Sequence, residues 1–383
     1  MINKPIRQQS ALLLTVMFLL IGLIPLSGCQ SPSETTDAGT TGRPTTTAGP
    51  VTTAEATTTP EPTEPTTLPT TTAGPDPIRV NPLTGLALDR QESVDQRPIA
   101  LMINNHRKAV PQIGIGRADL LFEMLVEGGI TRQMAVFADV LAIPEIGSIR
   151  SARHDYIELS AGLDAILVHV GGSKLASEQF RKQKIEHIDL HVFEKAYWRD
   201  PDWKSNRGYE HSVKTTGERL ADALTPNRFR TELRDDQGTA FQFRPTDGFQ
   251  PAGTTPATSV RVPYSDYAVA TFAYDPVNQV YSKGQFGRDQ IDLANDQPLR
   301  FTNIFLIVTR VVVLPGSVLK DADLESGKGY YISGGTRQAI SWRKGQTRDK
   351  LIFYDEQGNE LLVNVGKSYI GIVPTYAKIT FGD

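Results

Sequence analysis

The sequence predicts an α+β fold, in which a mixed α/β N-terminal domain is followed by a mostly-β C-terminal domain. Between residues 97 and 224, apolar runs of strand length alternate with segments of helical length. After residue 258, runs rich in β-branched and aromatic residues are separated by turn sequences, and no helical segment is visible. Residues 235–258 are rich in Gly, Thr, Pro and Asp. We therefore expect two domains, at residues 79–235 and 258–383, joined by this stretch.

The elements expected in the first domain begin with a strand at 97–103 and two further strands at 120–127 and 130–138. Only Gly128 and Gly129 separate these two strands. A two-residue Gly-Gly loop favours a hairpin, because the turns that close such hairpins need positive φ angles. The remaining expected elements are a helix at 152–161, a strand at 165–170, a helix from 173 to about 181, and a helix around 213–224.

In the second domain, turns are expected at 274–278 and 354–359, where Asp, Pro, Asn and Gly gather. The runs at 301–313, 329–342 and 350–363 have the composition of strands. This domain is therefore expected to consist of β-structure.

The N-terminus has the features of a bacterial lipoprotein signal. Lys4 and Arg7 precede an apolar segment at 11–26, and residues 26–29 read LSGC. A basic start, a short apolar core and small residues before a cysteine indicate a secretory signal at 1–28, cut before a lipid-modified Cys29. A transmembrane anchor is the alternative, but a span needs about 20 apolar residues and this segment is shorter. We expect the protein on the extracytoplasmic face of the cell membrane, with the membrane as its partner through the lipid on Cys29.

Residues 29–78 are rich in Thr and Pro and contain almost no large apolar side chain. Such a composition cannot bury enough surface to offset chain entropy, so a disordered linker is expected. In extended polyproline II conformation, at roughly 3.1 Å per residue, it would reach on the order of 150 Å.

Composition excludes several classes of function. Cys29 is the only cysteine, so no disulfide, cysteine metal site or cysteine nucleophile is available. The chain has 40 basic and 43 acidic residues; residues 1–78 hold 3 and 6 of these, which leaves 37 of each from residue 79 on. A neutral globular part argues against a nucleic-acid partner.

The common enzyme templates are also missing. The chain has no Gly-x-Ser-x-Gly elbow, no Walker loop and no His-Glu-x-x-His motif, and we expect no cofactor. His187 and His191 have the i, i+4 spacing of a helical metal pair, but the sequence around them resembles loop and strand, so no metal site is expected. Binding is favoured over catalysis on these grounds.

The hairpin predicts a polar cluster on one face of the sheet. If Glu127 lies opposite Ile130, then Glu123 and Glu127 share a face with Arg132, and Arg132 is diagonal to both acids. One interpretation is a buried salt bridge that fixes the strand register. The other is a site in which the acids orient Arg132 toward a ligand, because a buried ion pair is weak evidence for stability alone.

Two further segments point to an anion. Arg150 and Arg153 flank Ser151, a plausible N-cap of the following helix, and a helix N-terminus favours negative charge. His169 ends a strand that leads through two glycines into a helix capped by Ser173. The candidate anion site comprises Arg132, Arg150, Ser151, Arg153, His169, Gly171, Gly172, Ser173, Glu123, Glu127, Asn104, Asn105, His106 and His211.

Several longer motifs resemble the YerB-like bacterial lipoproteins. In the first domain they are NPLTG at 81–85, RPIALMINNH at 97–106, VEGGITR at 126–132, IRSAR at 149–153, HVGGS at 169–173 and WRD at 198–200. In the second they are ISWRK at 340–344 and GKSYIGIVP at 366–374. The resemblance implies a two-domain lipoprotein of a kind common in Gram-positive bacteria, and it implies no reaction.

Two positions depart from that family's pattern. Glu210, His211 and Ser212 stand where the family has Pro-His-Asn, and Gln290 stands where it has a histidine. A histidine mechanism shared between the two domains is therefore not expected.

The expected function is that of a membrane-anchored lipoprotein that binds an anionic ligand of the cell envelope, such as a cell-wall polymer or a lipid. One alternative is a cell-envelope phosphotransferase or hydrolase acting on a phosphorylated glycan or lipid, because wall-polymer ligases of the LytR-CpsA-Psr type also combine arginines and carboxylates. The other alternative is a protein-interaction scaffold whose polar cluster is purely structural.

The lipid signal yields a direct prediction. Cys29→Ser removes the thiol that would be acylated, so the variant should keep its signal and lose the diacylglycerol, whose two chains hold a protein at a membrane where one chain binds only marginally. Metabolic labelling with a palmitate analogue measures this. Label retained on the serine variant would contradict the assignment.

Overall fold

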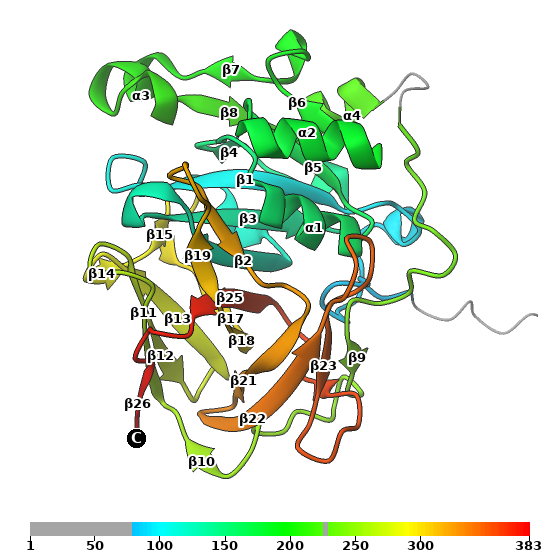
Figure 1. The fold of residues 1–383 in the computed structure, drawn as a ribbon. Helices are drawn as coiled ribbons and strands as arrows, with labels where there is room; N and C mark the ends of the chain where they lie inside the picture. The colour runs from blue at the N-terminus through cyan, green and yellow to red at the C-terminus, as the bar shows by residue number, and fades with distance from the viewer. Residues whose placement is uncertain (1–78, 225–228) are drawn as a thin grey trace, which may run out of the picture. The chain divides into compact units, whose positions relative to one another are not determined.

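The computed structural model describes residues 79–224 and 229–383, which belong to one compact unit, Thr72–Asp383. The signal expected at 1–28, the lipid modification expected on Cys29 and the linker expected at 29–78 lie outside the described residues. The predicted fold class is confirmed: a mixed α/β region comes first, and a mostly antiparallel β region follows (Figure 1).

Within the described residues, one mixed sheet of eleven strands contains strands from both halves of the chain. The first half contributes β2 (Leu120–Leu125), β3 (Thr131–Phe137), β1 (Ile99–Asn105), β5 (Ile166–His169) and β6 (His187–Asp189), in that spatial order. The second half contributes β10 (Thr255–Pro256), β22 (Thr336–Arg343), β21 (Ser326–Ser333), β18 (Asn303–Thr309) and β25 (Ser368–Pro374), while β23 (Ile352–Tyr354) pairs with β22.

The two halves meet where β2 and β25 pair in parallel, from Leu120 opposite Ser368 to Met124 opposite Ile372. Both strands are buried along their whole length, as is expected of parallel strands covered on both faces. The segments 79–235 and 258–383, which the sequence separates at a Gly- and Pro-rich stretch, are thus joined by an uninterrupted sheet.

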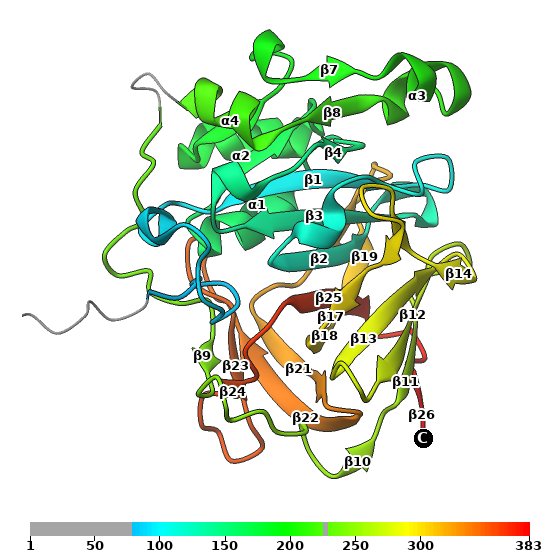
Figure 2. The ribbon, with the colours of Figure 1, turned by 180° about the vertical axis from the view of Figure 1, so that it is seen from behind.

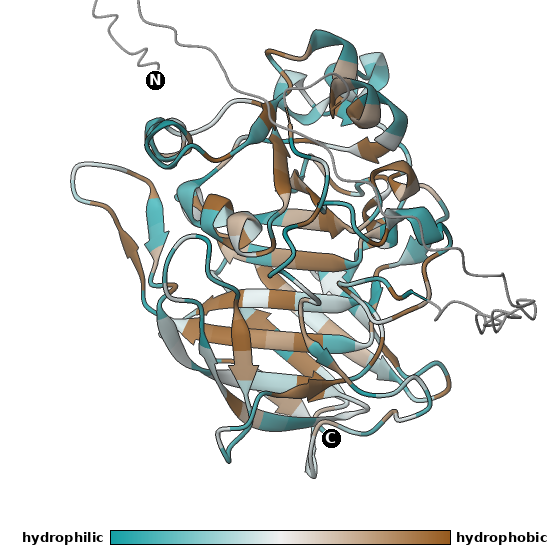
Figure 3. Ribbon diagram, turned by 90° about the vertical axis from the view of Figure 1, so that its right-hand side faces the viewer, coloured by the Kyte–Doolittle hydropathy of each residue, from teal (hydrophilic) through white to brown (hydrophobic). Residues whose placement is uncertain are grey.

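Each face of the sheet is covered by different elements. One face packs against α1 (His154–Gly162) and α2 (Lys174–Gln183), through Tyr156, Ile157 and Phe180. Apolar side chains of the other face join a second core, which includes residues of the six-stranded antiparallel sheet. Its strands are β14 (Arg288–Asp289), β13 (Val280–Gln285), β12 (Val269–Asp275), β11 (Ser259–Pro263), β26 (Thr380–Gly382) and β17 (Arg300–Phe301). In the view of Figure 2 the ribbons of β11, β12 and β13 lie below β2 and β3, and Figure 3 marks the apolar stretches of the strands in brown.

Smaller elements complete the described part. The remaining strands are β4 (Ile146–Gly147), β7 (Trp198–Arg199), β8 (Val213–Thr215), β9 (Gln242–Phe243), β15 (Ile291–Asp292), β16 (Gln297–Pro298), β19 (Val311–Val313), β20 (Lys320–Ala322) and β24 (Leu362–Val363). The remaining α-helices are α3 (Pro201–Asn206) and α4 (Gly217–Leu224). The helix predicted around 213–224 therefore begins later, after β8, and residues 259–383 contain no helix, as predicted.

The β2–β3 hairpin differs from its predicted register by one residue. Its loop has three residues, Glu127–Gly129, and the Val126 N–H donates to the Ile130 carbonyl at 2.9 Å. Glu123 therefore lies opposite Gln133, and Arg132 lies opposite Met124. A shift of one residue moves every side chain of a strand to the other face. The prediction that Glu123 and Arg132 share a face is wrong, because the loop includes Glu127 as well as the two glycines.

Glu123 instead points toward the six-stranded sheet, where it meets Lys283 of β13. Both side chains are completely buried, and Lys283 Nζ lies 3.1 Å from Glu123 Oε2. Thr131 Oγ1 (2.7 Å), Gln133 Nε2 (2.9 Å) and the Tyr369 hydroxyl (3.2 Å) also donate to this carboxylate. The charged pair thus ties β2 and β3 to β13 and β25.

This pair predicts a strong loss of stability for single substitutions. Lys283→Met should lower the free energy of unfolding by about 3–5 kcal/mol, because it leaves the Glu123 charge buried without its partner. The double variant Lys283→Met, Glu123→Gln should recover part of the loss, since no unpaired charge remains. Urea unfolding of the three proteins measures both effects. Equal losses in the single and double variants would contradict the role of the ion pair.

Candidate functional site

The candidate site lies where two parallel strands separate. β1 and β5 pair only from Ile99 to Leu101, and beyond this point the chain at 149–152 runs between them. The Arg150 N–H donates to the Met102 carbonyl at 2.8 Å, and the Val170 N–H donates to the Arg150 carbonyl at 3.1 Å. Ligands of α/β sheets commonly bind at the carboxyl ends of diverging strands. Here, that position is occupied by the backbone of an arginine.

Three arginines gather at this edge. Arg132 comes from β3, Arg150 from the inserted segment, and Arg153 from the N-terminus of α1. Arg153 is paired twice with Glu127, including a bond from Nε to Oε2 of 2.9 Å. Arg132 Nη1 donates to the Ser151 carbonyl at 2.8 Å. The predicted grouping of these arginines with Glu127 therefore occurs in the structure.

Two of the three guanidinium groups keep donors without acceptors. Arg132 Nε is buried and has no hydrogen-bond partner. The half-buried Arg150 guanidinium makes no hydrogen bond or ion pair within the described residues. A buried donor left unpaired costs about 1–3 kcal/mol, and more for a charged group. A bound hydrogen-bond acceptor would therefore lower the free energy of these two arginines.

The electrostatics point the same way. Burial, with the charges of Arg153 and Arg150, lowers the pKa of Arg132 to about 9. Burial also lowers the pKa of Arg150; Glu210 opposes this shift and Arg153 adds to it. Burial opposes ionisation of Glu127, but its hydrogen bonds and charge interaction with Arg153 dominate and lower its pKa to about 2. Glu127 therefore stays charged, and within the residues that the structure describes it pairs with Arg153 alone.

Two histidines, His106 and His211, lie close enough to Arg150 to feel its charge. His211 Nδ1 lies 2.8 Å from Asn104 Nδ2, so it accepts from that amide, and Glu210 Oε1 lies 3.3 Å from Nε2. The His106 ring stacks on His211 with centroids 5.2 Å apart. Burial lowers the pKa of both histidines, that of His211 to about 4, and Arg150 contributes to both shifts. Both imidazoles are neutral at neutral pH.

Other predicted site residues have different roles. Glu123 and Asn105 bond to each other at 3.1 Å within the buried network around Lys283. His169 lies between the Gly171 carbonyl (2.8 Å) and His187 Nδ1 (2.9 Å), and it stacks on Phe180. Burial lowers the pKa of His169 to about 4. These three residues are therefore held by structural contacts outside the arginine cluster.

The two predicted helix caps have different outcomes. Ser173 caps α2 by accepting from the Ala176 N–H at 3.1 Å, as predicted. Ser151 does not cap α1. A cap at Ser151 would start the helix at residue 152, but α1 starts at His154. Arg153 is the N-cap residue, and its side chain makes no capping hydrogen bond. Gly171 and Gly172 contact the site through the backbone, where the Ala152 N–H donates to the Gly171 carbonyl at 2.9 Å.

Sequence reasoning missed Tyr267 and Lys283, which come from the second half of the chain. The Tyr267 ring stacks on His106 with centroids 6.0 Å apart, and its hydroxyl accepts from the Arg107 N–H at 3.2 Å. No local sequence pattern predicts either contact, because about 160 residues separate Tyr267 from His106 and Lys283 from Glu123. Only the topology brings them together.

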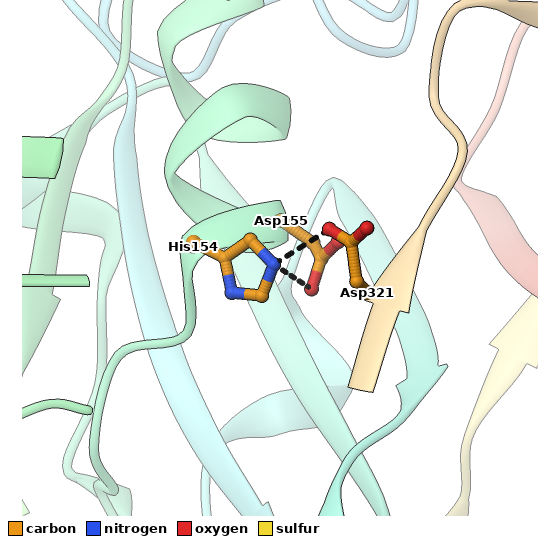
Figure 4. Close-up of side chains that lie close together, drawn as sticks. All are labelled: His154, Asp155 and Asp321. Atoms are coloured by element: carbon orange, nitrogen blue, oxygen red, sulfur yellow. Dashed lines mark hydrogen bonds and ion pairs between the residues drawn. The ribbon is translucent and has the colours of Figure 1, made fainter. Parts of the chain in front are cut away.

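His154, Asp155 and Asp321 form a second polar cluster (Figure 4). His154 Nε2 lies 2.9 Å from Asp321 Oδ1 and 3.6 Å from Asp155 Oδ2. A metal bound to Nε2 would leave the ring proton on Nδ1. Metal-bound histidines normally donate this N–H to an acceptor. Nδ1 is buried and has no partner. We therefore assign the cluster to holding β20 against α1, to which the bond from the Ala322 N–H to Asp155 Oδ1 (2.9 Å) also contributes.

Comparison with known proteins identifies similar chains. Residues 83–230 match the family described as "Protein of unknown function (DUF3048) N-terminal domain", and residues 260–370 match its C-terminal domain. The chain is 31% identical over 314 residues to a Bacillus subtilis protein named "Putative lipoprotein YerB", covering 79% of this chain and 89% of that one.

The crystal structure of the YerB protein from Bacillus subtilis is similar as well. The TM-score is 0.68 at 27% identity, over 79% of this chain and 99% of the solved chain. The resemblance to YerB-like proteins that the motifs indicate is therefore confirmed. In the part of this chain that the structure describes, no helix has both the length and the apolar character needed to cross a membrane.

The His154 cluster predicts a pH effect on stability. Burial raises the pKa of Asp155 to about 6 from an ordinary value of 3.8. A raised carboxyl pKa means that the folded state holds the proton more tightly, so stability falls as pH rises from about 4 to 6, by about 1.4 kcal/mol per pKa unit.

Asp155→Asn should remove this loss, because a neutral amide need not ionise and can still accept from Ala322. Urea unfolding between pH 4 and 8 measures it, with the exposed Asp266→Asn as the control. The same pH slope in Asp155→Asn and the wild type would be the contrary result.

Proposed function

Because the chain belongs to the DUF3048 family, in which its Bacillus relative is named a lipoprotein, we propose that it is a lipid-anchored protein on the extracytoplasmic face of the cell membrane that binds an anionic ligand of the cell envelope. The anchor would be the lipid on Cys29, at the end of the LSGC sequence. The linker at 29–78 would let the folded unit act at a distance from its anchor.

The unpaired donors of the arginine cluster carry the binding proposal. Arg153 and Arg150 lie close enough to Arg132 to add to the lowering of its pKa, and Arg153 also adds to the lowering of the pKa of Arg150. Among the described residues, Glu127 pairs with Arg153 and with no other arginine. Phosphate and carboxylate oxygens match the planar guanidinium fork, which can donate two hydrogen bonds at once. An anion between Arg132 and Arg150 would accept the hydrogen bonds that the protein leaves unmade and would offset the repulsion.

The same observation weighs against the two alternatives. A purely structural cluster, as in a protein-interaction scaffold, gains nothing from a buried arginine donor without an acceptor. A phosphotransferase or hydrolase would need a base beside the bound anion, and the two nearby histidines are instead held by stacking and by Asn104. Binding an anion without a catalysed reaction requires no catalytic base.

Thermal unfolding at low ionic strength tests the proposal, with inorganic phosphate and pyrophosphate as probes. A ligand at about 100 times its dissociation constant stabilises by roughly 2.7 kcal/mol, which raises Tm measurably. Arg150→Ala should abolish this shift and leave the ligand-free Tm unchanged or higher, because the repulsion from Arg132 and Arg153 is relieved. Arg150→Lys should respond weakly, since lysine lacks the bidentate fork.

Two further variants sharpen the test. Glu127→Gln frees Arg153 from its carboxylate and should enlarge the response to phosphate. Arg261→Ala removes an exposed arginine on β11 and should respond as the wild type does. A wild type without a phosphate-dependent shift, or an Arg150→Ala variant that responds like it, would refute the site.

A further inference from the structure

A small cavity lies where the two halves of the chain meet, beside the turn that joins β13 to β14 (Figure 1). Ligand sites are commonly found between domains, and the walls here come from both halves. A single water needs about 10–15 Å³ of such space, so a cavity of about 110 Å³ admits a group of several non-hydrogen atoms. The lining residues are Val110, Pro111, Gln285, Arg288, Asp289, Gln290 and Ile291.

Contacts behind the walls hold the cavity in shape. The Leu293 N–H donates to the Gln112 carbonyl at 2.9 Å, which ties the two halves together beside the cavity. Gln112 Nε2 in turn donates to the Asn104 carbonyl at 3.0 Å. Arg207 Nη1 donates to the Pro111 carbonyl at 2.8 Å. The walls are thus fixed by the protein itself, without a ligand.

Two buried glutamine amides line the cavity, and only one of them has all its partners. Gln290 accepts from Lys283 Nζ at 2.7 Å, and its Nε2 donates to Gln112 and Gln133, at 3.1 Å in both cases. Gln285 also accepts from Lys283 Nζ, at 2.8 Å, but its buried Nε2 has no partner. Because the lysine can only donate, the Gln285 amide cannot turn round to bond its Nε2 there. A buried donor without an acceptor costs free energy, which a ligand at this position would recover.

A second donor without a partner lies on the same face of the sheet. Arg288 is directly opposite Gln285 in the β13–β14 pair, and side chains opposite each other point to one face. The exposed Arg288 side chain makes no hydrogen bond or ion pair within the described residues. The Asp289 side chain, opposite Gly284, belongs to the other face, because successive side chains alternate. Two donors therefore serve the cavity, with no carboxylate of β14 on their face.

We infer that the cavity binds a carboxylate on a short apolar group, of the kind that ends a peptide whose last residue is alanine. One carboxylate oxygen would accept from Gln285 Nε2 and the other from the Arg288 guanidinium, a group that matches carboxylates in geometry. The methyl group would pack against Val110, Pro111 and Ile291. This site shares no residue with the arginine cluster, and inorganic phosphate, which has no apolar part, gains nothing from these walls.

Isothermal titration calorimetry of the full chain tests the inference with three probes. N-acetylalanine represents the end of a peptide, propionate represents a free short-chain acid, and the neutral amide of N-acetylalanine lacks the carboxylate. The wild type should bind N-acetylalanine at least as tightly as propionate, and the amide at least about tenfold more weakly, since its terminal NH₂ would face a donor. Tighter binding of propionate would overturn the assignment to a peptide end.

Variants of the two donors locate the binding. Arg288→Ala and Gln285→Leu should each weaken the binding of N-acetylalanine at least about tenfold, because each removes a hydrogen bond to a charged group. Gln285→Leu also takes an acceptor from Lys283; if that variant does not fold, the exposed Arg288 decides alone. The control is Arg261→Ala, at an exposed arginine of β11 outside the cavity lining, which should bind as the wild type does.

Arg150→Ala separates this site from the proposed anion site. It should lose the thermal response to inorganic phosphate and keep the wild-type affinity for N-acetylalanine, whereas Arg288→Ala should do the reverse. A wild type that does not bind N-acetylalanine, or unchanged affinity in Arg288→Ala, would overturn the inference and leave the phosphate site standing. Loss of N-acetylalanine binding in Arg150→Ala would also overturn it, because the carboxylate would then bind at the arginine cluster.

Discussion

The fold depends on the charged pair of Glu123 and Lys283. Each belongs to a different half of the chain, neither is accessible to water, and 3.1 Å separates Nζ from Oε2. Burial lowers the pKa of Lys283 and the carboxylate counteracts this shift, so each charge requires the other. Lys283 also donates to Gln285 and Gln290, and Gln290 bonds to Gln112 and Gln133. A slip of either sheet would leave several buried polar groups unpaired, so the network fixes how the halves dock.

The same hairpin presents two polar clusters on opposite faces, and their contrast separates structure from function. Around Glu123, the carboxylate oxygens accept from donors on four strands, namely β1, β3, β13 and β25. Around Arg132, by contrast, a buried donor has no partner and a neighbouring guanidinium is free within the described residues. An unmade hydrogen bond at a buried guanidinium costs free energy, which a bound anion would recover. This contrast supports the proposal of an anion site at Arg132 and Arg150, while the contacts of Glu123 are structural.

Local sequence patterns predicted the parts of the fold that depend on neighbouring residues. The Ser173 cap, the strands around Gly128 and Gly129, and the all-β second half follow from spacing and composition, and they occur in the structure. The register of the β2–β3 hairpin could not be predicted from these patterns, because it depends on whether Glu127 belongs to the strand or to the loop. A shift of one residue moves the side chains of a strand to the opposite face of the sheet. The shared sheet and Lys283 could not be predicted either, since contacts across more than 100 residues leave no periodic signal. The grouping of Arg132, Arg150 and Arg153 was predicted partly for a wrong reason, because α1 begins at His154 and Ser151 is not its cap.

The start of α1 connects the arginine cluster to the hairpin of β19 and β20. Arg153 is the last residue before the helix, and His154 and Asp155 at its start hold β20. A displacement of the helix start would therefore move Arg153 and the base of the β19–β20 hairpin together. Ionisation of Asp155 in this buried position costs free energy, which raises its pKa. An apolar contact could hold β20 without this cost in stability. The directional hydrogen bonds from His154 to Asp321 and from the Ala322 N–H to Asp155 instead fix how β20 lies against the start of α1.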